Sequence, residues 1–336
     1  MKGFALNEQI SGIKNIFTGK AFSFTSTKAG SIAFKIFRTL FIFGLSYLFL
    51  FPVIYMFSTA FQSVNSVSDP SVVWIPKELS IEPLKAVIEL IGYWDSVILT
   101  LVITVPSTIL ALLSCSLAGY GLARFRFPGE KIIFFAVLIT IVVPPQAVLV
   151  SSYMNFRFFD FGGIMKLFAP LLGYDSFNMI DTPMTFILPS AFASGLRNGL
   201  FVFIFRQYFG GMPKELEEAS KIDGCGAFFT YVRIMMPLAK SAFITVALFS
   251  FVWHWNDFYS MSFYFTGKIR PITPTLSTLL DQMVVGGFTQ SSSVSQINLR
   301  VYFAAGALLT VAPPLILYII LQRQFTESIE KSGIVG

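Results

Sequence analysis

The chain is long, apolar and poor in charge. Of its 336 residues, 54% are hydrophobic and only 12% are charged, whereas about a quarter of the residues in ordinary soluble domains are charged. This composition excludes an ordinary soluble protein and predicts an integral membrane protein, because lipid accommodates Phe and Leu that a soluble core has no room to bury. The net charge of +6 is expected to reflect inner loops beside anionic lipid headgroups, so we expect no nucleic-acid partner.

Six apolar runs are long enough to cross a bilayer, whose hydrocarbon core of about 30 Å needs roughly 20 helical residues. The run that contains Arg197 and the run that contains His254 and Asp257 are interrupted by polar residues, and the others contain no charged residue. We therefore predict an all-α integral membrane protein with six transmembrane helices, over residues 39–60, 96–123, 132–156, 182–205, 241–265 and 301–321. The prolines inside these runs are expected to kink the helices; they are Pro106, Pro144, Pro145, Pro313 and Pro314.

The distribution of Lys and Arg predicts that both termini are cytoplasmic. Basic residues collect in the cytoplasmic loops of membrane proteins, and most of the 24 Lys and Arg residues would lie on one side of the six predicted helices. We therefore predict a cytoplasmic N-terminal tail (1–38), a first transmembrane helix (39–60), an extracellular loop (61–95), a core of five transmembrane helices (96–322) with a cytoplasmic loop at 206–240, and a cytoplasmic C-terminal tail (323–336).

The cytoplasmic loop contains apolar residues at helical spacing and is predicted to be folded. Pro213 suits the first turn of a helix, residues 214–223 carry both acids and bases, and Gly224 suits the position just after a helix C-terminus. A second short helix is expected to begin near Ala227. From composition alone, residues 214–223 are a solvated surface helix at the membrane boundary.

The spacing of residues in this loop is more specific than its composition. Glu218-Ala219-Ser220 is followed by Gly224, Ile234 and Pro237 at fixed offsets. This pattern resembles the signature loop of binding-protein-dependent ABC importer permeases, which has Glu-Ala-Ala, Gly, Ile and Pro at the same offsets. The stretch 213–224 resembles the carbohydrate branch of that family, in particular the maltose-type second permease. Ser220 replaces the usual second Ala, and Met236 replaces a Leu.

Other segments extend the resemblance over nearly the whole chain after residue 39. Residues 118–129 resemble the end of the family's second helix, 203–209 the approach to the signature loop, 253–258 the tryptophan and asparagine patch of sugar permeases, and 322–325 their C-terminal end. The stretches 171–181 and 281–298 are longer than usual in the family, so the docking partner and the substrate are less well defined.

The resemblance implies that residues 214–223 form a coupling helix, which docks in a cleft of a separate cytoplasmic ATPase. Glu218 would offer a carboxylate to a basic group, a charge-assisted contact. Ala219 and Ser220 would allow close approach, and Leu216 would fill an apolar hole. The residues implied in coupling are Leu216, Glu218, Ala219, Ser220, Asp223, Gly224, Ile234 and Pro237.

The implied assembly contains a second homologous permease, two ATPase subunits and an extracellular or periplasmic solute-binding protein, in the cytoplasmic membrane of a bacterium. The sequence has no phosphate-binding loop, so ATP and Mg are expected on the ATPase and no cofactor in this chain. The sequence has no Cys/His cluster that would suggest a metal site. It also has no Ser-His arrangement that would suggest a membrane protease. We therefore expect a transporter subunit and not an enzyme.

Polar residues inside the predicted helices are candidates for the solute path. An Arg near a helix centre costs about 2.5–3.5 kcal/mol to insert, so Arg197 is expected to face protein or water; it could line the path or pair with Asp257. Aromatic and amide side chains at 253–258 suit sugar rings and hydroxyls, although an aromatic belt at the interface would also explain the tryptophans. The candidates are Arg197, Asn198, Trp253, Trp255, Asn256 and Asp257, and His254 is expected to be a packing residue.

We expect the solute to be a sugar, most simply an oligosaccharide. An ABC permease for amino acids or polyamines is the nearest alternative, since the signature loop is shared. An ion-coupled secondary transporter is a further alternative, against which the lack of an internal repeat argues. A membrane enzyme would need convergent catalytic groups at one depth, and the sequence offers none.

Overall fold

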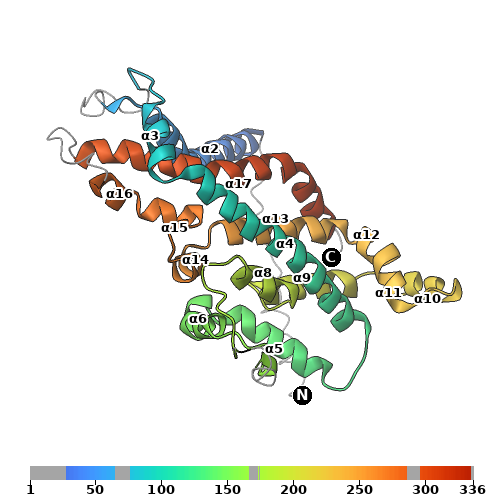
Figure 1. Cartoon of the computed structure of the whole chain (residues 1–336). Coiled ribbons are helices and arrows are strands. Elements are labelled where there is room, and N and C mark those ends of the chain that lie inside the picture. Colours follow the sequence, from blue (N-terminus) through green and yellow to red (C-terminus); the bar gives the residue numbers. More distant parts are fainter. Residues whose placement is uncertain (1–27, 65–75, 166–172, 174, 286–295, 334–336) are drawn as a thin grey trace, which may run out of the picture. The chain divides into compact units, whose positions relative to one another are not determined.

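The computed structural model describes residues 28–64, 76–165, 173, 175–285 and 296–333 (Figure 1). The chain divides into two compact units, residues 1–56 and 57–336, which are considered separately. Within the described residues the regular structure is helical, and extended pairing is limited to two isolated bridges. The all-α prediction is therefore confirmed over this part of the chain.

The first unit consists of most of α2, the helix Lys28–Ala60. Its apolar side chains are exposed along most of its length. The segment Gly30–Ala60 is long and apolar enough to cross a membrane. The predicted first transmembrane helix is thus helical, but the helix begins before residue 39 and includes the end of the predicted tail. Residues 1–27 of that tail lie outside the described residues.

The second unit is built around α4, the helix Tyr93–Arg124, which packs against α8 (Met184–Ala191), α9 (Asn198–Gly210) and α13 (Lys240–Trp255). The remaining α-helices are α3 (Glu82–Leu90), α5 (Glu130–Val142), α6 (Leu149–Arg157), α10 (Glu215–Ile222), α11 (Ala227–Thr230), α12 (Met236–Leu238), α14 (Phe258–Tyr264), α15 (Ile272–Ser277), α16 (Leu279–Val285) and α17 (Gln296–Gly333). A short 3-10 helix, η2 (Pro145–Val148), precedes α6, and a π-helical turn, η3 (Tyr231–Met235), joins α11 to α12.

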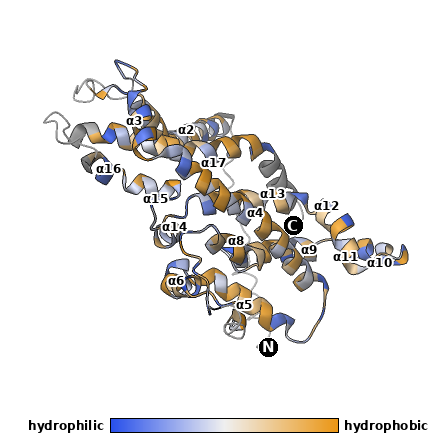
Figure 2. Cartoon of the chain, in the orientation of Figure 1, coloured by the Kyte–Doolittle hydropathy of each residue, from blue (hydrophilic) through white to orange (hydrophobic). Residues whose placement is uncertain are grey.

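Many of the buried residues of α4 are small or bear a hydroxyl group, although Ile103 and Tyr120 are buried too, and most of its exposed apolar residues are large, as is common for a helix that packs in a membrane. Figure 2 shows hydrophobic residues along α4, α5 and α17. The buried residues of α4 include Ser96, Thr100, Thr104, Ser107, Ala111, Ser116 and Gly119. Its exposed residues include Ile98, Leu101, Val105, Ile109, Leu113 and Leu117.

Several buried hydroxyl groups of α4 hold neighbouring elements. Thr100 accepts a hydrogen bond from the backbone N–H of Ile272 at the start of α15 (2.9 Å), and Thr108 accepts one from Ser250 in α13 (3.2 Å). Near the other end, the hydroxyl groups of Ser116 and Tyr231 are hydrogen-bonded at 2.7 Å. α4 therefore connects the two ends of the second unit: Figure 1 shows α3 and α16 at one end and α10 and α11 at the opposite end.

The predicted crossing over residues 132–156 is divided into two helices. The helical pair 130–142 and 145–157 is bent by 99°. Pro144 and Pro145 occupy the bend, where their missing N–H groups and fixed φ angles interrupt the helical hydrogen bonds. The predicted kink at these prolines is confirmed, although it is larger than a kink within one helix. By contrast, α17 continues through Pro313 and Pro314, and α4 through Pro106.

The predicted helices over 182–205 and 241–265 are also divided. The first consists of α8 and α9, separated by residues 192–197, in which Ala193 and Arg197 have positive φ angles. The second consists of α13 and α14, which are separated at Asn256 and Asp257. The helical run 227–238, which precedes α13, makes an angle of 78° with it. Polar and positive-φ residues explain both divisions, because neither kind continues a helix readily.

Three described helices are long and apolar enough to cross a membrane, and the number is at most five when each bent pair is taken as one crossing. The described residues thus support a helical membrane protein but do not reach the predicted total of six. The stretch 281–298, which the sequence indicated to be longer than usual in the family, lies partly outside the described residues, between α16 and α17.

Candidate functional site

The turn between α8 and α9 presents Arg197 in a strained backbone conformation. Arg197 has φ +59° and occupies the N-cap position of α9. A positive φ costs a non-glycine residue about 1–3 kcal/mol, and such strain is concentrated at functional sites. The side-chain amide of Asn198, oriented to satisfy both of its neighbours, donates to the Leu196 carbonyl (3.3 Å) and accepts from the Gly195 N–H (3.1 Å). Asn198 thereby fixes the turn that carries Arg197.

A cavity of about 190 Å³ lies beside this turn, between η2, α13 and α14. Its lining combines three aromatic rings, two amides and two groups of opposite charge. The residues that contribute these groups are Trp253, Phe258, Tyr259, Gln146, Asn256, Arg197 and Asp257. We call this cavity the polar pocket.

Arg197 faces the polar pocket without a close anionic partner. Its guanidinium carbon lies 5.5 Å from the centre of the Trp253 ring, a cation–π distance. Among the described residues no carboxylate lies within 4.0 Å of the guanidinium, although Arg197 and Asp257 interact electrostatically. The alternative in which Arg197 pairs directly with Asp257 is therefore not found among the described residues.

Asp257 is held by the helix that follows it. One of its carboxylate oxygens accepts a hydrogen bond from the backbone N–H of Ser260 (3.1 Å), so Asp257 caps the N-terminus of α14. The other oxygen is buried, and no hydrogen bond to it is found among the described residues. Asp257 thus combines a structural role with a free acceptor at the edge of the polar pocket.

Two of the predicted path residues do not line the pocket. Trp255 is fully buried, and its indole N–H donates to the Thr310 carbonyl of α17 (3.0 Å). Asn198 is buried in the turn described above. His254, expected to be a packing residue, is likewise buried and bonded to the Ser250 carbonyl of its own helix (2.8 Å). In this structure Trp255 and Asn198 therefore pack behind the residues that line the polar pocket.

Gln146 and Tyr259 line the polar pocket and were missed from the sequence. Gln146 directly follows the Pro144-Pro145 pair, and Tyr259 lies two residues beyond Asp257. A polar residue beside a helix break is the signal that would have pointed to Gln146, because polar backbone groups at membrane depth are tolerated where they line a cavity.

A larger cavity of about 380 Å³ adjoins the polar pocket and shares Arg197 with it. Its walls come from α5, α6 and α8 and are mostly apolar. Hydroxyl groups of Ser152, Thr185 and Ser260 are among the few polar ones. We call it the apolar pocket; Ile139 and Thr140 of α5 form part of its wall.

At the far end of the unit, α10 ends as predicted at Gly224. Gly224 has φ +78°, its N–H donates to the Lys221 carbonyl (3.0 Å), and the Cys225 N–H donates to the Ser220 carbonyl (2.9 Å). This is the hydrogen-bond pattern of a glycine-terminated helix. The predicted second helix at Ala227 is also present, whereas Pro213 precedes the helix instead of forming its first turn.

The faces of α10 differ in exposure. Ser220 is buried and its hydroxyl is hydrogen-bonded to that of Thr230 (2.7 Å), so it holds α10 against α11 and is not available to a partner. Leu216 is half-buried. The exposed apolar residue of α10 is instead Ile222, at 87%, which lies on the same face as Glu218 because residues four apart are neighbours on a helix.

The other residues of the predicted coupling loop are spread over its surface. Ala219, Asp223 and Pro237 are exposed, and Ile234 is half-buried in η3. Phe228 and Phe229 of α11 are exposed beside the end of α10, at 65% and 55%. The sequence predicted only that this loop is folded, and it did not indicate that these two phenylalanines are exposed. No group of His, Cys, Asp and Glu within the described residues is arranged to hold a metal ion.

The family model described as "binding-protein-dependent transport system inner membrane component" matches residues 112–331. The chain belongs to this family. The matched region contains the α8–α9 turn, both pockets, α10 and α11. The chain is therefore a permease subunit of an ABC importer and not an enzyme, and ATP hydrolysis is carried out by a separate ATPase in such systems.

Curated relatives of this permease cover most of its length. It is 24% identical over 288 residues to the diacetylchitobiose uptake system permease protein DasC of Streptomyces coelicolor, a match to 85% of this chain and 92% of the relative. It is 25% identical over 295 residues to the arabinooligosaccharides transport system permease protein AraQ of Halalkalibacterium halodurans, a match to 87% of this chain and 93% of the relative.

A solved structure shares the fold of the permease. It belongs to a bacterial ABC transporter involved in the import of the acidic polysaccharide alginate, and the similarity covers 88% of this chain and 98% of that chain with a TM-score of 0.69. At 21% identity this likeness concerns the fold alone.

Proposed function

We propose that this permease forms half of the translocation pathway for an oligosaccharide, in the cytoplasmic membrane of a bacterium. The relatives named above are permeases for diacetylchitobiose and for arabinooligosaccharides, and they support a saccharide substrate. A second permease completes the pathway, a solute-binding protein delivers the solute from outside, and two ATPase subunits bind ATP and Mg on the cytoplasmic side.

The proposed topology has six crossings and both termini in the cytoplasm. The broken pairs α5–α6, α8–α9 and α13–α14 each form one crossing, and α2, α4 and α17 form the others. Broken helices are tolerated within a membrane where the freed backbone groups face a cavity, and the breaks at Pro145, Arg197 and Asp257 all border the polar pocket. The N-terminal tail, the outer loop at 61–95 and the C-terminal tail keep the sides assigned to them from the sequence.

The polar pocket is the proposed solute contact of this subunit, and its composition is the observation that carries the proposal. The Trp253 ring, which stacks on Phe201 and Phe249, lines the pocket with apolar surface for the C–H side of a sugar ring. Asn256, Gln146 and Asp257 offer donors and acceptors to hydroxyl groups. Polar groups that converge on a mostly apolar, concave surface are typical of small-molecule sites.

An amino acid is the second candidate for the solute, because Arg197 and Asp257 bring opposite charges to one cavity. A zwitterion would use both charges but would have little need for the Trp253 face. Competition of unlabelled oligosaccharides and amino acids against labelled uptake distinguishes the two, since only the true class competes at low concentration.

The proposed coupling surface consists of Glu218, Ala219 and Ile222 on the exposed face of α10, with Phe228 of α11 beside it. The carboxylate can pair with a basic group of the ATPase, while the apolar side chains supply the area that such a contact buries. Gly224 gives the sharp end of the helix, and Asp223, Ile234 and Pro237 shape the loop that returns to the membrane.

The coupling surface is tested with Glu218→Lys and Gly224→Pro in the full importer reconstituted with its ATPase. Both variants are expected to insert and to lose solute uptake driven by ATP, because one reverses a contact charge and the other cannot adopt φ +78°. The control is Glu78→Lys, which makes the same charge reversal at an exposed site far along the chain. Normal uptake by both coupling variants would remove α10 from the proposal.

A further inference from the structure

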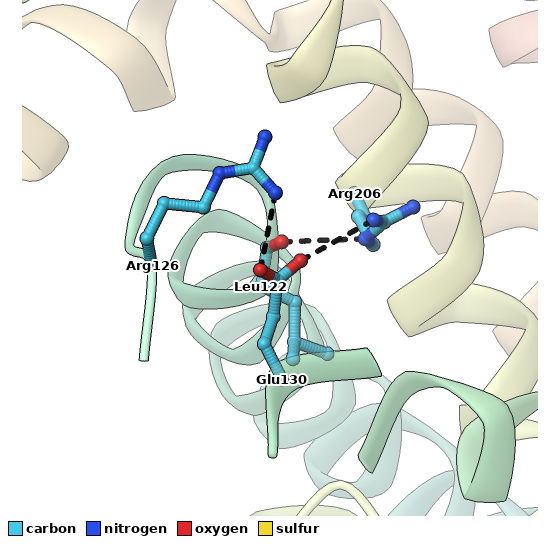
Figure 3. Close-up of polar contacts among 4 residues, drawn as sticks. All are labelled: Leu122, Arg126, Glu130 and Arg206. Carbon is cyan, nitrogen blue, oxygen red and sulfur yellow. Dashed lines mark hydrogen bonds and ion pairs between the residues drawn. The ribbon is translucent and has the colours of Figure 1, made fainter. Parts of the chain in front are cut away.

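The carboxylate of Glu130 is buried at the start of α5, close to the C-terminal end of α4. Glu130 is 6% exposed and lies in the first turn of the helix, where the partial positive charge of the helix terminus favours an anion. Arg126 and Arg206 bind its two oxygens at 3.2 Å and 3.5 Å. Figure 3 shows the two guanidinium groups approaching Glu130 from different segments, the loop after α4 and the helix α9.

Arg206 joins three helices with one guanidinium group. Besides its ion pair to Glu130, it donates from Nε to the Leu122 carbonyl in the last turn of α4 (3.3 Å; Figure 3). Its guanidinium carbon also lies 3.7 Å from the centre of the Phe134 ring of α5. A planar guanidinium is suited to simultaneous ion-pair, carbonyl and aromatic contacts, and lysine is not. The ends of α4, α5 and α9 are therefore held at one point.

Arg124 connects the same end of α4 to α10. Its Nη2 donates to the Met212 carbonyl just before α10 (2.8 Å), and its Nε lies 3.4 Å from a carboxylate oxygen of Glu217. Both side chains are largely buried, at 5% and 15% exposure. Glu217 lies on the inward face of α10, beside the exposed Glu218.

These two ion pairs form a continuous path from α10 to the wall of the apolar pocket. The path runs from Glu217 to Arg124, along the last turn of α4 to Leu122, then through Arg206 to Glu130 and α5. α5 contributes Ile139 and Thr140 to the pocket wall. Buried ion pairs seldom add net stability compared with apolar residues of similar size, since both charges must be desolvated. The two ion pairs, together with the hydrogen bonds of the same arginines to the Met212 and Leu122 carbonyls, instead link the helices that they join at fixed points.

We propose that Glu130, Arg206 and Arg124 are positioning residues that transmit displacement of α10 to the pocket wall formed by α5. This inference rests on the proposed coupling of α10 to an ATPase. When the ATPase moves α10, the Glu217–Arg124 pair moves the end of α4, and the Arg206–Glu130 pair makes α5 follow together with α9. The exposed Arg126 takes no part in this path, since it comes from the loop and is 83% exposed.

The inference is tested by Glu130→Gln and Arg206→Gln in the importer reconstituted in vesicles with its ATPase and binding protein. The measurement is the amount of solute transported per ATP hydrolysed. We expect each variant to continue ATP hydrolysis but to lower this ratio about fivefold or more, within the usual range of coupling between distant sites. Arg126→Gln is the matched control, because it removes the other partner of the same carboxylate, and it is expected to keep the wild-type ratio.

The double variant Glu130→Gln/Arg206→Gln separates transmission from general damage. If the two residues act only through one another, the double variant is no worse than either single variant. Multiplied losses, or a wild-type ratio in both single variants, would overturn the inference. So would an equal loss in Arg126→Gln. Failure of the proposed function has a different signature, namely a wild-type permease that binds no ATPase or shows no ATP-driven uptake.

Discussion

At the scale of single residues, Arg197 illustrates how the fold presents a costly side chain to a cavity. A positive φ angle and the Asn198 hydrogen bonds shape the backbone turn, and the guanidinium lies at a cation–π distance from the Trp253 ring. No described carboxylate lies at ion-pair distance from it. Whether Arg197 contacts solute or only packs is decided by substitution.

Arg197→Ala is expected to weaken solute uptake more than it lowers the amount of permease in the membrane. A desolvated cation contact contributes about 1–2 kcal/mol, which corresponds to an affinity loss of roughly 5- to 30-fold. Arg197→Lys should keep part of the affinity because the charge remains. Concentration-dependent uptake, with permease abundance measured by immunoblot, checks this. A loss of abundance at unchanged affinity would show that Arg197 is structural.

Local features of the site could be predicted from sequence, whereas the direction of a side chain could not. Gly224 was predictable because a helix end and a positive φ are properties of a few consecutive residues. Trp255 and Trp253 are two residues apart on one helix, so they point in different directions, and only the packing of α17 shows which is buried. For the same reason Ile222 replaces Leu216 as the exposed apolar residue of α10.

At the scale of elements, the central contact is between α4 and α9, and a glycine permits it. A Cβ atom added at Gly119 would lie 2.6 Å from Cβ of Phe205 and 2.9 Å from the backbone nitrogen of Arg206. Backbone atoms cannot move away from an added Cβ as the end of a flexible side chain can. The two helices can therefore lie this close only because position 119 has no side chain, which is typical of packing between helices in membranes.

Gly119→Ala is expected to destabilise the permease by about 1–3 kcal/mol, the usual range for overpacking. Gly121→Ala is the matched control: it lies in the same helix, and nothing is within 4 Å of its added Cβ. Alanine gains the same helix propensity at both positions, so the control should be neutral or slightly stabilising. The midpoint of thermal unfolding in detergent measures the difference. Equal midpoints for the two variants would contradict the close α4–α9 contact.

The broken helices show why hydropathy alone predicted the elements incompletely. A run of apolar residues has the same composition whether it forms one straight helix or two short helices that meet at a cavity. The break at Pro144 and Pro145 was predictable, because proline interrupts the hydrogen bonds of a helix. The turn at 192–197 contains the turn-forming pair Ser194-Gly195, but a hydropathy average over the apolar run passes over it. The positive φ angles of Ala193 and Arg197 could not be predicted from their residue types.

At the scale of the whole molecule, the second unit has an end at α10 and α11 where hydrophilic and hydrophobic residues are mixed (Figure 2), and the proposed function requires this end to face the cytoplasm. The two cysteines of the chain can be used to determine which side of the membrane this end faces. Cys225 follows Gly224 in the coupling loop and is partly exposed, whereas Cys115 is buried within α4. A polar maleimide that cannot cross membranes should therefore react at Cys225 alone, and only from the side that the loop faces.

We expect this maleimide to label the permease in inverted membrane vesicles and not in right-side-out vesicles. Cys225→Ser should abolish the labelling, because Cys115 remains inaccessible. Adding the ATPase subunits to inverted vesicles should slow the reaction, since a partner that covers Ile222 and Phe228 also covers the neighbouring Cys225. Labelling from the outside would reverse the topology, and labelling from the inside that the ATPase does not slow would separate this loop from the docking surface.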